Sequence, residues 1–281
     1  MTSVMQAFRN TVNSLETAGV TDAYFEARLL VKHSLGIHTT ELYSDSNRLV
    51  APQELATLKD CISRRLSGEP GAYITGVREF FGLNFFVDNR VLIPRPETEL
   101  VVEKALEYAS KKGRLVIADI GTGSGAIAVS IAVNLPSSYI YAIDSSAGAI
   151  EVGIINARRH HVTSNILFVK GDFAESIPEP VSLLVANLPY IPESQIGLLP
   201  REVARYEPYQ ALNGGHDGLA LYRRLLIKMS DILLPGGCAV LEIGWNQARG
   251  MRQLIQEHLP TATAEYFTDL NGITRVIRIN L

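Results

Sequence analysis

The residues Asn187, Leu188, Pro189 and Tyr190 form a turn, "NLPY", directly after the apolar run "VSLLVA". A carboxamide, a rigid proline and an aromatic ring are an unusual combination for a simple connecting turn. The carboxamide oxygen and a main-chain carbonyl oxygen can accept hydrogen bonds from N–H groups, and the tyrosine ring can pack on a flat group. The turn therefore predicts a binding site for a planar, nitrogen-bearing group, although alone it also fits a proline-set turn with a half-buried tyrosine.

A glycine-rich turn follows an earlier apolar run, where "RLVIADI" leads into "GTGSGAIAVSIAV". Gly121, Gly123 and Gly125 let the backbone approach a ligand closely, and the helix that begins behind them offers free N–H groups. The spacing of Gly121, Gly123 and Ala126 also satisfies the looser dinucleotide fingerprint GxGxxG/A. The turn therefore predicts a nucleotide-like cofactor without deciding which one.

Acidic and aromatic residues lie where the next two apolar runs end. "YIYAID" ends in Asp144, about 20 residues beyond the glycines, where a carboxylate can accept hydrogen bonds from both ribose hydroxyls. "NILFVKGDF" ends in Asp172 and Phe173, which offer an acceptor and an aromatic face to an adenine ring. Singly, these residues also fit helix caps, a loop carboxylate and a core phenylalanine. Because ligands of open α/β sheets bind at the carboxyl ends of strands, together they predict one site.

The elements that must position these residues begin near residue 114. From there, short apolar runs alternate with helical stretches, which predicts an α/β domain with a mostly parallel sheet and helices on both faces. The last two runs, "TAEYFTD" and "TRVIRINL", are separated only by "LNGI". This connection permits a hairpin but no crossover helix, so the C-terminal strand is expected to be antiparallel to its neighbour. Earlier in the chain, "VREFFGLNFFVDNRVLIP" predicts a β-hairpin linker.

Before the hairpin, the sequence predicts a small helical bundle. Three helical stretches end in Gly19, Gly36 and Gly68, and the second opens at a Thr21/Asp22 cap. The charged residues of this part nearly balance, so it can contact a protein partner or merely cover the next domain.

We therefore expect a helical domain over residues 1–75, a β-hairpin linker over 76–95 and the α/β domain over 96–281.

Composition limits the class of protein. The 281 residues carry a formal net charge of −3 and are 47% hydrophobic, which supplies a globular core and argues against nucleic-acid phosphates as the main source of affinity. Cys61 and Cys238 lack ligand spacing and are expected to be reduced, and His160-His161 lacks companion ligands, so no metal is expected. Without a signal-peptide pattern or an apolar run of the ~20 residues that a spanning helix needs, we expect a soluble, cytoplasmic protein without a membrane partner.

These motifs resemble those of class I S-adenosylmethionine-dependent methyltransferases, in the branch that carries [N/D]-x-P-[Y/F/W] and methylates planar nitrogens. The HemK/PrmC family of protein-(glutamine-N5) methyltransferases, which act on peptide chain release factors, is similar over nearly the whole chain. The similarity is carried by "YITGVREFFGLNFFVDNRVLIPRPETELVVE", "EPYQALNGGHDGL", "LEIGWNQ" and "DLNGITRVIRI". "LIPRPETE" is specific to this family among methyltransferases, and the similarity is weakest over the first 60 residues.

The resemblance implies a Rossmann-like methyltransferase domain that binds S-adenosylmethionine over the glycine loop and leaves S-adenosylhomocysteine as product. The ribose is implied to lie on Asp144 and the adenine beside Phe173. The cofactor-binding residues implied are Gly121, Thr122, Gly123, Ser124, Gly125, Asp144, Asp172, Phe173 and Asn187.

The implied substrate is the glutamine of the Gly-Gly-Gln motif of class I release factors, bound at Asn187, Leu188, Pro189 and Tyr190. Our hypothesis is that the helical bundle holds the release factor while its Gly-Gly-Gln loop extends to this turn. Of these, Asn187, Pro189 and Tyr190 are expected to be catalytic. An amide nitrogen is a poor nucleophile, so the site must fix both N–H bonds through the Asn187 side-chain oxygen and a main-chain carbonyl of the Leu188-Pro189 segment. Leu188 replaces the usual proline of the family, which removes a φ restraint but keeps the carbonyl.

Other interpretations stay open. "NLPY" also resembles the turn of ribosomal RNA adenine dimethyltransferases, so a nucleic-acid adenine N6 methyltransferase is the main alternative. An NAD-dependent oxidoreductase and a non-catalytic adaptor are weaker ones. "LIPRPETE" either ends the hairpin at Pro94 and Pro96 and begins a helix at Glu97 or Thr98, or it helps to wall the cofactor site.

We expect a monomer that does not bind nucleic acid directly.

Overall fold

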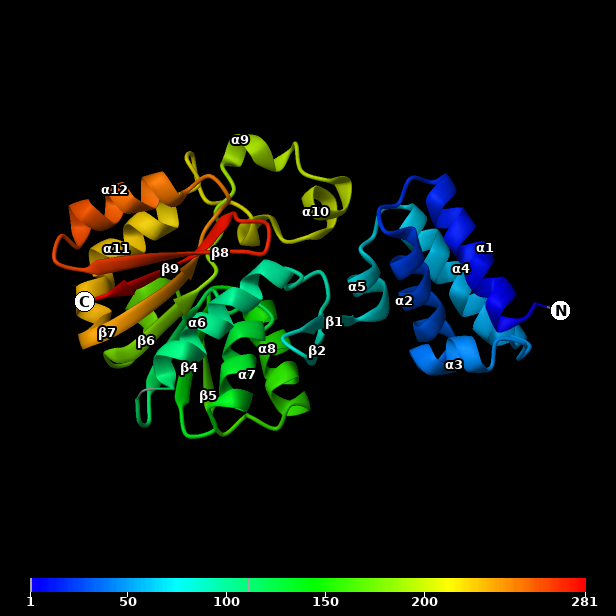
Figure 1. The fold of residues 1–281 in the computed structure, drawn as a ribbon, viewed down its shortest axis with the longest axis horizontal. Helices are drawn as coiled ribbons and strands as arrows, with labels where there is room; N and C mark the ends of the chain where they lie inside the picture. Colours follow the sequence, from blue (N-terminus) through cyan, green and yellow to red (C-terminus); the bar gives the residue numbers. More distant parts are fainter. Residues whose placement is uncertain (1, 111) are drawn as a thin grey trace. The chain divides into compact units, whose positions relative to one another are not determined.

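The computed structural model describes residues 2–110 and 112–281 and divides into two compact units (Figure 1). The small unit comprises Met1–Val77 together with Pro200–Tyr206, and the large unit comprises Arg78–Leu199 and Glu207–Leu281. Among the described residues, no helix combines the length and the apolar character needed to cross a bilayer. The three-part domain division drawn from the sequence stays a prediction, because compactness alone does not define what each domain does.

The small unit is the helical bundle that the sequence predicts. α1 begins where the Ser3 hydroxyl accepts a hydrogen bond from the Gln6 N–H at 3.2 Å. α2 begins after Asp22 as expected, but Asp22 has a φ of 53° and its side chain makes no capping hydrogen bond. The helices of this unit are α1 (Val4–Thr17), α2 (Ala23–Leu35), α3 (Thr39–Ser44), α4 (Pro52–Leu66), α5 (Gly71–Thr75) and α10 (Arg201–Tyr206).

Arg65 on α4 is the buried charge of the small unit. Its Nε lies 2.7 Å from the Glu26 carboxylate on α2, and its Nη2 lies 2.8 Å from the Glu202 carboxylate on α10. Glu202 follows Arg65 by 137 residues in sequence, so this ion pair attaches a distant segment to the bundle. A buried guanidinium needs such partners, because burying an unpaired charge is costly.

The large unit holds a hairpin and a seven-stranded sheet whose order is β5-β4-β3-β6-β7-β9-β8. Strands β5, β4, β3, β6 and β7 pair in parallel, whereas β9 is antiparallel to both β7 and β8. The predicted sheet with its antiparallel C-terminal strand is confirmed. The strands are β1 (Val77–Phe80) and β2 (Leu83–Phe86) in the hairpin, and β3 (Val116–Ile120), β4 (Tyr139–Asp144), β5 (Ile166–Lys170), β6 (Val181–Ala186), β7 (Leu233–Glu242), β8 (Thr263–Thr268) and β9 (Thr274–Asn280) in the sheet.

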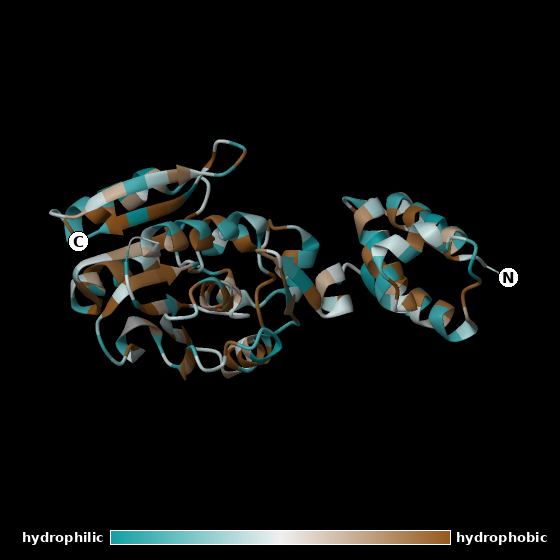
Figure 2. Cartoon of the chain, turned by 60° about the horizontal axis from the view of Figure 1, so that its bottom comes forward, coloured by the Kyte–Doolittle hydropathy of each residue, from teal (hydrophilic) through white to brown (hydrophobic). Residues whose placement is uncertain are grey.

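Helices cover both faces of the sheet (Figure 1). Side chains alternate along a strand, so Ile117 packs into the core on one face and Ala118 into the core on the other. Figure 2 shows hydrophobic and hydrophilic residues mixed along many of the helices, as expected where one side of a helix faces a core. One core includes residues of α6 (Glu99–Ala109), α7 (Ala126–Asn134) and α8 (Ala147–Arg159), and the other includes residues of α11 (Ala220–Ile232) and α12 (Ala248–His258).

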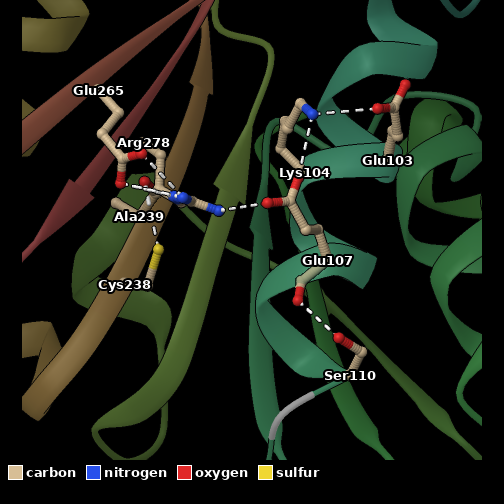
Figure 3. Close-up of polar contacts among 8 residues, drawn as sticks. All are labelled: Glu103, Lys104, Glu107, Ser110, Cys238, Ala239, Glu265 and Arg278. Atoms are coloured by element: carbon tan, nitrogen blue, oxygen red, sulfur yellow. Dashed lines mark hydrogen bonds and ion pairs between the residues drawn. The ribbon is translucent and has the colours of Figure 1, made fainter.

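Ion pairs connect α6 to the antiparallel end of the sheet (Figure 3). Arg278 on β9 lies 2.9 Å from Glu265 on β8 and 3.4 Å from Glu107 on α6. The Lys104 ammonium lies 3.0 Å from Glu107 and 4.8 Å from the centre of the Phe267 ring. The Arg278 guanidinium contacts the same ring at 5.2 Å, so two cations and one aromatic ring hold the helix to the strands.

Asp119 on β3 is a fully buried carboxylate. Its Oδ2 accepts hydrogen bonds from the Thr122 hydroxyl at 2.6 Å and the Ala128 N–H at 3.2 Å, while its Oδ1 has no hydrogen-bond partner among the described residues. Burial raises the pKa of Asp119 from 3.8 to about 7, against the opposing effect of these two hydrogen bonds.

The pKa of Asp119 predicts a pH dependence of stability. Between about pH 4 and pH 7, the Asp119 carboxyl is protonated in the folded protein and ionised in the unfolded chain, so the contribution of this group to stability falls as the pH rises through that window. Asp119→Asn has no titratable group at this position. The free energy of unfolding of the variant relative to that of the wild type is therefore expected to rise by up to about 4 kcal/mol between about pH 4 and pH 7. Urea unfolding of both proteins at pH 4, 5.5, 7 and 8 measures this rise. If the free energies of unfolding of the two proteins changed in parallel with pH, the prediction would be wrong.

The buried ion pairs of Arg65 predict that its replacement lowers the stability of the protein. Arg65→Met leaves the Glu26 and Glu202 carboxylates without their shared partner and is expected to lower the free energy of unfolding by about 1 to 3 kcal/mol. Arg64→Met on the same helix is the matched control, because the half-exposed Arg64 pairs with Glu69 and its loss should cost less than about 1 kcal/mol. Urea unfolding followed by circular dichroism compares the two variants, and equal losses would argue against the buried pairing.

Candidate active site

The carboxyl edge of the parallel strands opens into a cavity of about 230 Å³. The structure brings most of the residues predicted for cofactor and substrate into its wall, so the glycine loop and the "NLPY" turn share one cavity. Gly125 and Tyr190 are not among the lining residues. The predicted residues that do line the cavity are Gly121, Thr122, Gly123, Ser124, Asp144, Asp172, Phe173, Asn187, Leu188 and Pro189.

The glycine loop connects β3 to α7. Gly121 and Gly123 have φ values of 72° and 54°, a region that side-chain-bearing residues rarely adopt. Gly125 is the N-cap of α7, with a φ of 77°. A Cβ atom at Gly125 would lie 3.2 Å from the Cα of Gly153 on α8. Gly125 therefore allows the two helices to approach closely, while Gly121 and Gly123 face the cavity.

Asp144 ends β4 and lines the cavity beside the loop. Its Oδ2 accepts a hydrogen bond from the Gly123 N–H at 2.9 Å, and its Oδ1 accepts one from the Ser146 N–H at 2.9 Å. Burial raises the pKa of Asp144, whereas these backbone hydrogen bonds lower it. Each carboxylate oxygen keeps a second lone pair, so the group can still accept hydrogen bonds from a ligand diol.

Asp172 and Phe173 follow β5 and are held by Arg224 of α11. The Arg224 guanidinium lies 4.7 Å from the centre of the Phe173 ring, 3.2 Å from the Asp172 carboxylate and 2.9 Å from the Glu175 carboxylate. The Phe173 side chain is buried, but 79% of the Asp172 side chain is exposed. The ring is therefore a fixed apolar part of the cavity wall, whereas Asp172 is a solvent-facing, paired carboxylate.

The carboxamide of Asn187 has a defined orientation. Its Nδ2 donates a hydrogen bond to the Thr98 hydroxyl oxygen at 3.1 Å, which leaves the Oδ1 acceptor for a ligand N–H. The next residue, Leu188, is buried, and its carbonyl oxygen accepts a hydrogen bond from the Tyr222 hydroxyl at 3.3 Å. A carbonyl oxygen has two lone pairs, so that of Leu188 can accept a second hydrogen bond.

Tyr190 lies behind the cavity wall and is fixed from three sides. Its hydroxyl lies 3.4 Å from Oε1 of Glu242, and its carbonyl oxygen accepts a hydrogen bond from the Gln247 side chain at 2.9 Å. Burial raises the pKa of Tyr190 above its usual range. A Cβ atom at Gly214 would lie 2.7 Å from the Cα of Tyr190, so only glycine allows that loop to pack against the turn.

The "LIPRPETE" segment contributes to the wall. Pro94, Arg95 and Thr98 line the cavity, and Pro96 begins a short 3-10 helix. The Arg95 guanidinium lies 2.5 Å from the Glu207 carboxylate, whose side chain is 1% exposed. This placement supports the interpretation that the segment helps to wall the site.

His160, the first residue of the histidine pair, packs against the β1–β2 hairpin. The His160 Nε2 lies 2.9 Å from the Asn84 carbonyl oxygen, and its ring lies 5.3 Å from that of Phe85. Within residues 2–110 and 112–281, no group of three or more His, Cys, Asp or Glu side chains is arranged to hold a metal ion.

Several residues of the site were not predicted. Arg90 lines the cavity, Glu207 and Arg224 hold residues that line it, and Glu242 holds Tyr190 behind its wall. Only Glu242 has a recognisable signal in the sequence, since it is the single acid within the apolar run "CAVLEIG" that forms the end of a central strand. The partners of the others come from distant segments, and pairwise spacing in the sequence does not reveal them.

Comparison with known proteins is consistent over the whole chain. Residues 6–76 match the family model described as the PrmC N-terminal domain, and residues 95–191 match that of ribosomal protein L11 methyltransferase (PrmA). A release factor glutamine methyltransferase of Bradyrhizobium diazoefficiens is 36% identical, over 98% of this chain and 94% of the relative. One of Chlorobaculum tepidum is 37% identical, over 97% and 95%.

Solved structures agree on the fold. The ribosomal protein L11 methylase of Lactobacillus delbrueckii subsp. bulgaricus has a TM-score of 0.51 at 18% identity, over 69% of this chain and 82% of that one. At this identity the likeness shows the fold alone, which confirms the predicted Rossmann-like methyltransferase sheet. With relatives more than 30% identical over nearly its full length, the chain belongs to the release factor glutamine methyltransferase family.

Proposed function

We propose that this protein methylates the side-chain amide nitrogen (N5) of the glutamine in the Gly-Gly-Gln motif of class I release factors, with S-adenosylmethionine as the donor. The observation that carries the proposal is the orientation of Asn187. Its amide nitrogen is engaged by Thr98, so its oxygen is available to an amide N–H in a cavity that also contains the glycine loop.

The residues present fit the proposed cofactor. Gly121 and Gly123 lie at the N-terminal end of α7 with backbone conformations that favour glycine, which allows a ligand to approach the main chain. Asp144 has lone pairs for ribose hydroxyls, and Phe173 offers apolar surface to a base. S-adenosylmethionine, when bound, supplies an electrophilic methyl group, which is the difficult part of the chemistry.

The "NLPY" turn contributes by holding the substrate amide in a fixed orientation. One amide N–H of the substrate glutamine donates to Oδ1 of Asn187, and the other donates to the free lone pair of the Leu188 carbonyl or to the Pro189 carbonyl. With both N–H bonds held, the nitrogen can be aimed at the methyl group. Fixed orientation of this kind lowers a barrier by about 7 to 11 kcal/mol in favourable cases, so no strong general base is needed. The replacement of proline by Leu188 leaves this main-chain acceptor in place.

The small unit is proposed to hold the release factor, because its residues 6–76 match the PrmC N-terminal domain. The names of the relatives support release factors as substrates. The protein is proposed to act as a monomer and without direct binding of nucleic acid, in keeping with its net charge of −3.

Methyl transfer from labelled S-adenosylmethionine tests the proposal directly. The acceptors are a purified release factor, the same factor with Gln→Ala in its Gly-Gly-Gln motif, duplex DNA and ribosomal RNA. Label on the intact factor alone is expected. Label on a nucleic acid would instead mean that the turn binds an adenine amine.

Asn187→Ala is expected to reduce the rate of methyl transfer at least about 100-fold, because it removes the acceptor that orients the substrate amide. Asn134→Ala is the control: Asn134 is exposed, and its side chain donates a hydrogen bond to the Ser130 carbonyl oxygen on the same helix. Thermal melting should show both variants folded. Wild-type rates in Asn187→Ala would exclude the proposed role of the turn.

Asp144→Ala is expected to weaken binding of S-adenosylhomocysteine about 10- to 100-fold, because the ribose loses its acceptor and the N–H groups of Gly123 and Ser146 lose theirs. Asp172→Ala should weaken it much less, since the Asp172 carboxylate is exposed and already paired with Arg224. Titration calorimetry measures both constants, and a larger effect at Asp172 would reverse the assignment.

A further inference from the structure

Asn156 on α8 is a buried amide beside the glycine loop. Its Oδ1 accepts a hydrogen bond from the Phe86 N–H at 2.7 Å. Its Nδ2 donates to the carbonyl oxygens of Phe86 at 2.9 Å and Ser124 at 2.8 Å. Because Ser124 belongs to the glycine loop and lines the cavity, one side chain holds this loop to the β1–β2 hairpin.

Gln247 is a second buried amide, and it lies beside the "NLPY" turn. Its Oε1 accepts a hydrogen bond from the Gly244 N–H at 2.9 Å. Its Nε2 donates to the carbonyl oxygens of Tyr190 at 2.9 Å and Gly218 at 3.0 Å. A Cβ atom at Gly218 would collide with the Tyr190 carbonyl oxygen, so only glycine allows this approach. Gln247 thus holds the last residue of the turn to the segments that precede α11 and follow β7.

The partners decide how each amide lies. In both side chains the oxygen accepts from a main-chain N–H, and the NH₂ group donates to two main-chain carbonyl oxygens. Rotating either amide by half a turn would place its oxygen against two oxygens and its NH₂ group against an N–H, so all three hydrogen bonds would be lost. Because buried polar groups without partners are costly, each amide holds its partners in a single arrangement.

We propose that these two amides are positioning residues for separate halves of the site. Asn156 fixes the glycine loop for S-adenosylmethionine, and Gln247 fixes the turn for the substrate amide. This inference rests on the proposed glutamine methylation. The partners of the two amides lie in different segments, so the loss of one amide is expected to disturb one half of the site. Amides that served only the stability of the fold would affect both halves alike.

Asn156 acts on the peptide group between Ser124 and Gly125. The carbonyl oxygen of this group accepts from Asn156, and its N–H donates to the Thr122 carbonyl oxygen at 2.8 Å. The peptide group is therefore held on both sides where the loop joins α7. A rotated peptide group would change the directions of the main-chain N–H groups that the loop offers to a ligand. Asn156 is therefore expected to affect cofactor affinity.

Gln247 acts on the peptide group between Tyr190 and Ile191. The carbonyl oxygen of this group accepts from Gln247, and its N–H donates to the Leu212 carbonyl oxygen at 3.1 Å. The chain is therefore fixed where it leaves the turn, three residues after Asn187. A displacement of reacting groups by about 1 Å can slow a reaction about 100-fold. Gln247 is therefore expected to affect the rate of transfer.

Asn156→Leu and Gln247→Met are a matched pair of variants. Each replaces a buried amide by an apolar side chain of similar shape and removes three hydrogen bonds. The measurements are Kd for S-adenosylhomocysteine, and kcat at saturating S-adenosylmethionine and release factor. Asn156→Leu is expected to raise Kd at least about tenfold and to keep kcat within about threefold of the wild type. Gln247→Met is expected to lower kcat at least about tenfold and to keep Kd within about threefold.

The double variant Asn156→Leu/Gln247→Met tests the separation. It should have the Kd of Asn156→Leu and the kcat of Gln247→Met, each within about threefold. Melting temperatures identify a variant that fails to fold. Asn156→Asp or Gln247→Glu then takes its place, since these keep the volume and the accepting oxygen but lose the donors.

Hydrogen exchange in the wild type needs no variant. The Phe86 N–H reports on Asn156, and the Gly244 N–H reports on Gln247. S-adenosylhomocysteine is expected to slow exchange of the Phe86 N–H at least about threefold more than that of the Gly244 N–H, because a ligand on the glycine loop stabilises the bonds that hold this loop.

Equal effects of the two single variants on Kd and kcat, the reverse pattern, or wild-type values in both would each overturn the inference. Equal slowing of exchange at the two N–H groups would do the same. Failure of the proposed function is distinct, since the wild type then puts no label on the release factor. If it labels a nucleic acid instead, kcat is measured with that acceptor, and without any acceptor the Kd values and the exchange rates decide.

Discussion

The site depends on one feature of the sheet: β3 and β6 are neighbours, but the chain leaves them toward opposite faces. After β3 it forms α7, whose residues belong to one core, and after β6 it eventually forms α11, whose residues belong to the other. The two connections diverge at the carboxyl edge, and a crevice must open between them. The glycine loop and the "NLPY" turn begin at these adjacent strand ends, which is why motifs more than 60 residues apart in sequence meet in one cavity.

Opening a crevice does not by itself give a site that can orient an amide. That requires polar groups whose hydrogen bonds are set before the ligand arrives. The turn meets this condition, because its main chain is held by Tyr222 and Gln247 and its side chains are held by Thr98 and Glu242. The polar groups around the turn are mostly committed to one another, and the oxygen of Asn187 is left for the ligand.

The sequence predicted the parts of the fold that follow from local patterns. The alternating apolar runs, the glycine loop and the Asn-Gly hairpin required no knowledge of distant contacts, and the strand-end residues Asp144 and Asn187 followed from the fold class. What it did not predict was long-range pairing, such as that of Arg95 with Glu207 or Arg224 with Asp172. Nor did it predict that Gly125 serves helix packing, because which way a loop residue faces depends on φ and ψ angles and on neighbouring helices.

The attachment of α10 to the bundle through Arg65 and Glu202 makes the small unit discontinuous in sequence. The chain passes from one unit to the other after residues 77, 199 and 206, so no single cut yields either unit whole. A protein shortened to begin at residue 78 would carry an orphaned segment, residues 200–206, in the loop that follows the "NLPY" turn. A loss of activity in this shortened protein could come from the damaged loop as well as from the missing bundle. Shortening the chain is therefore a poor way to assign separate functions to the two units.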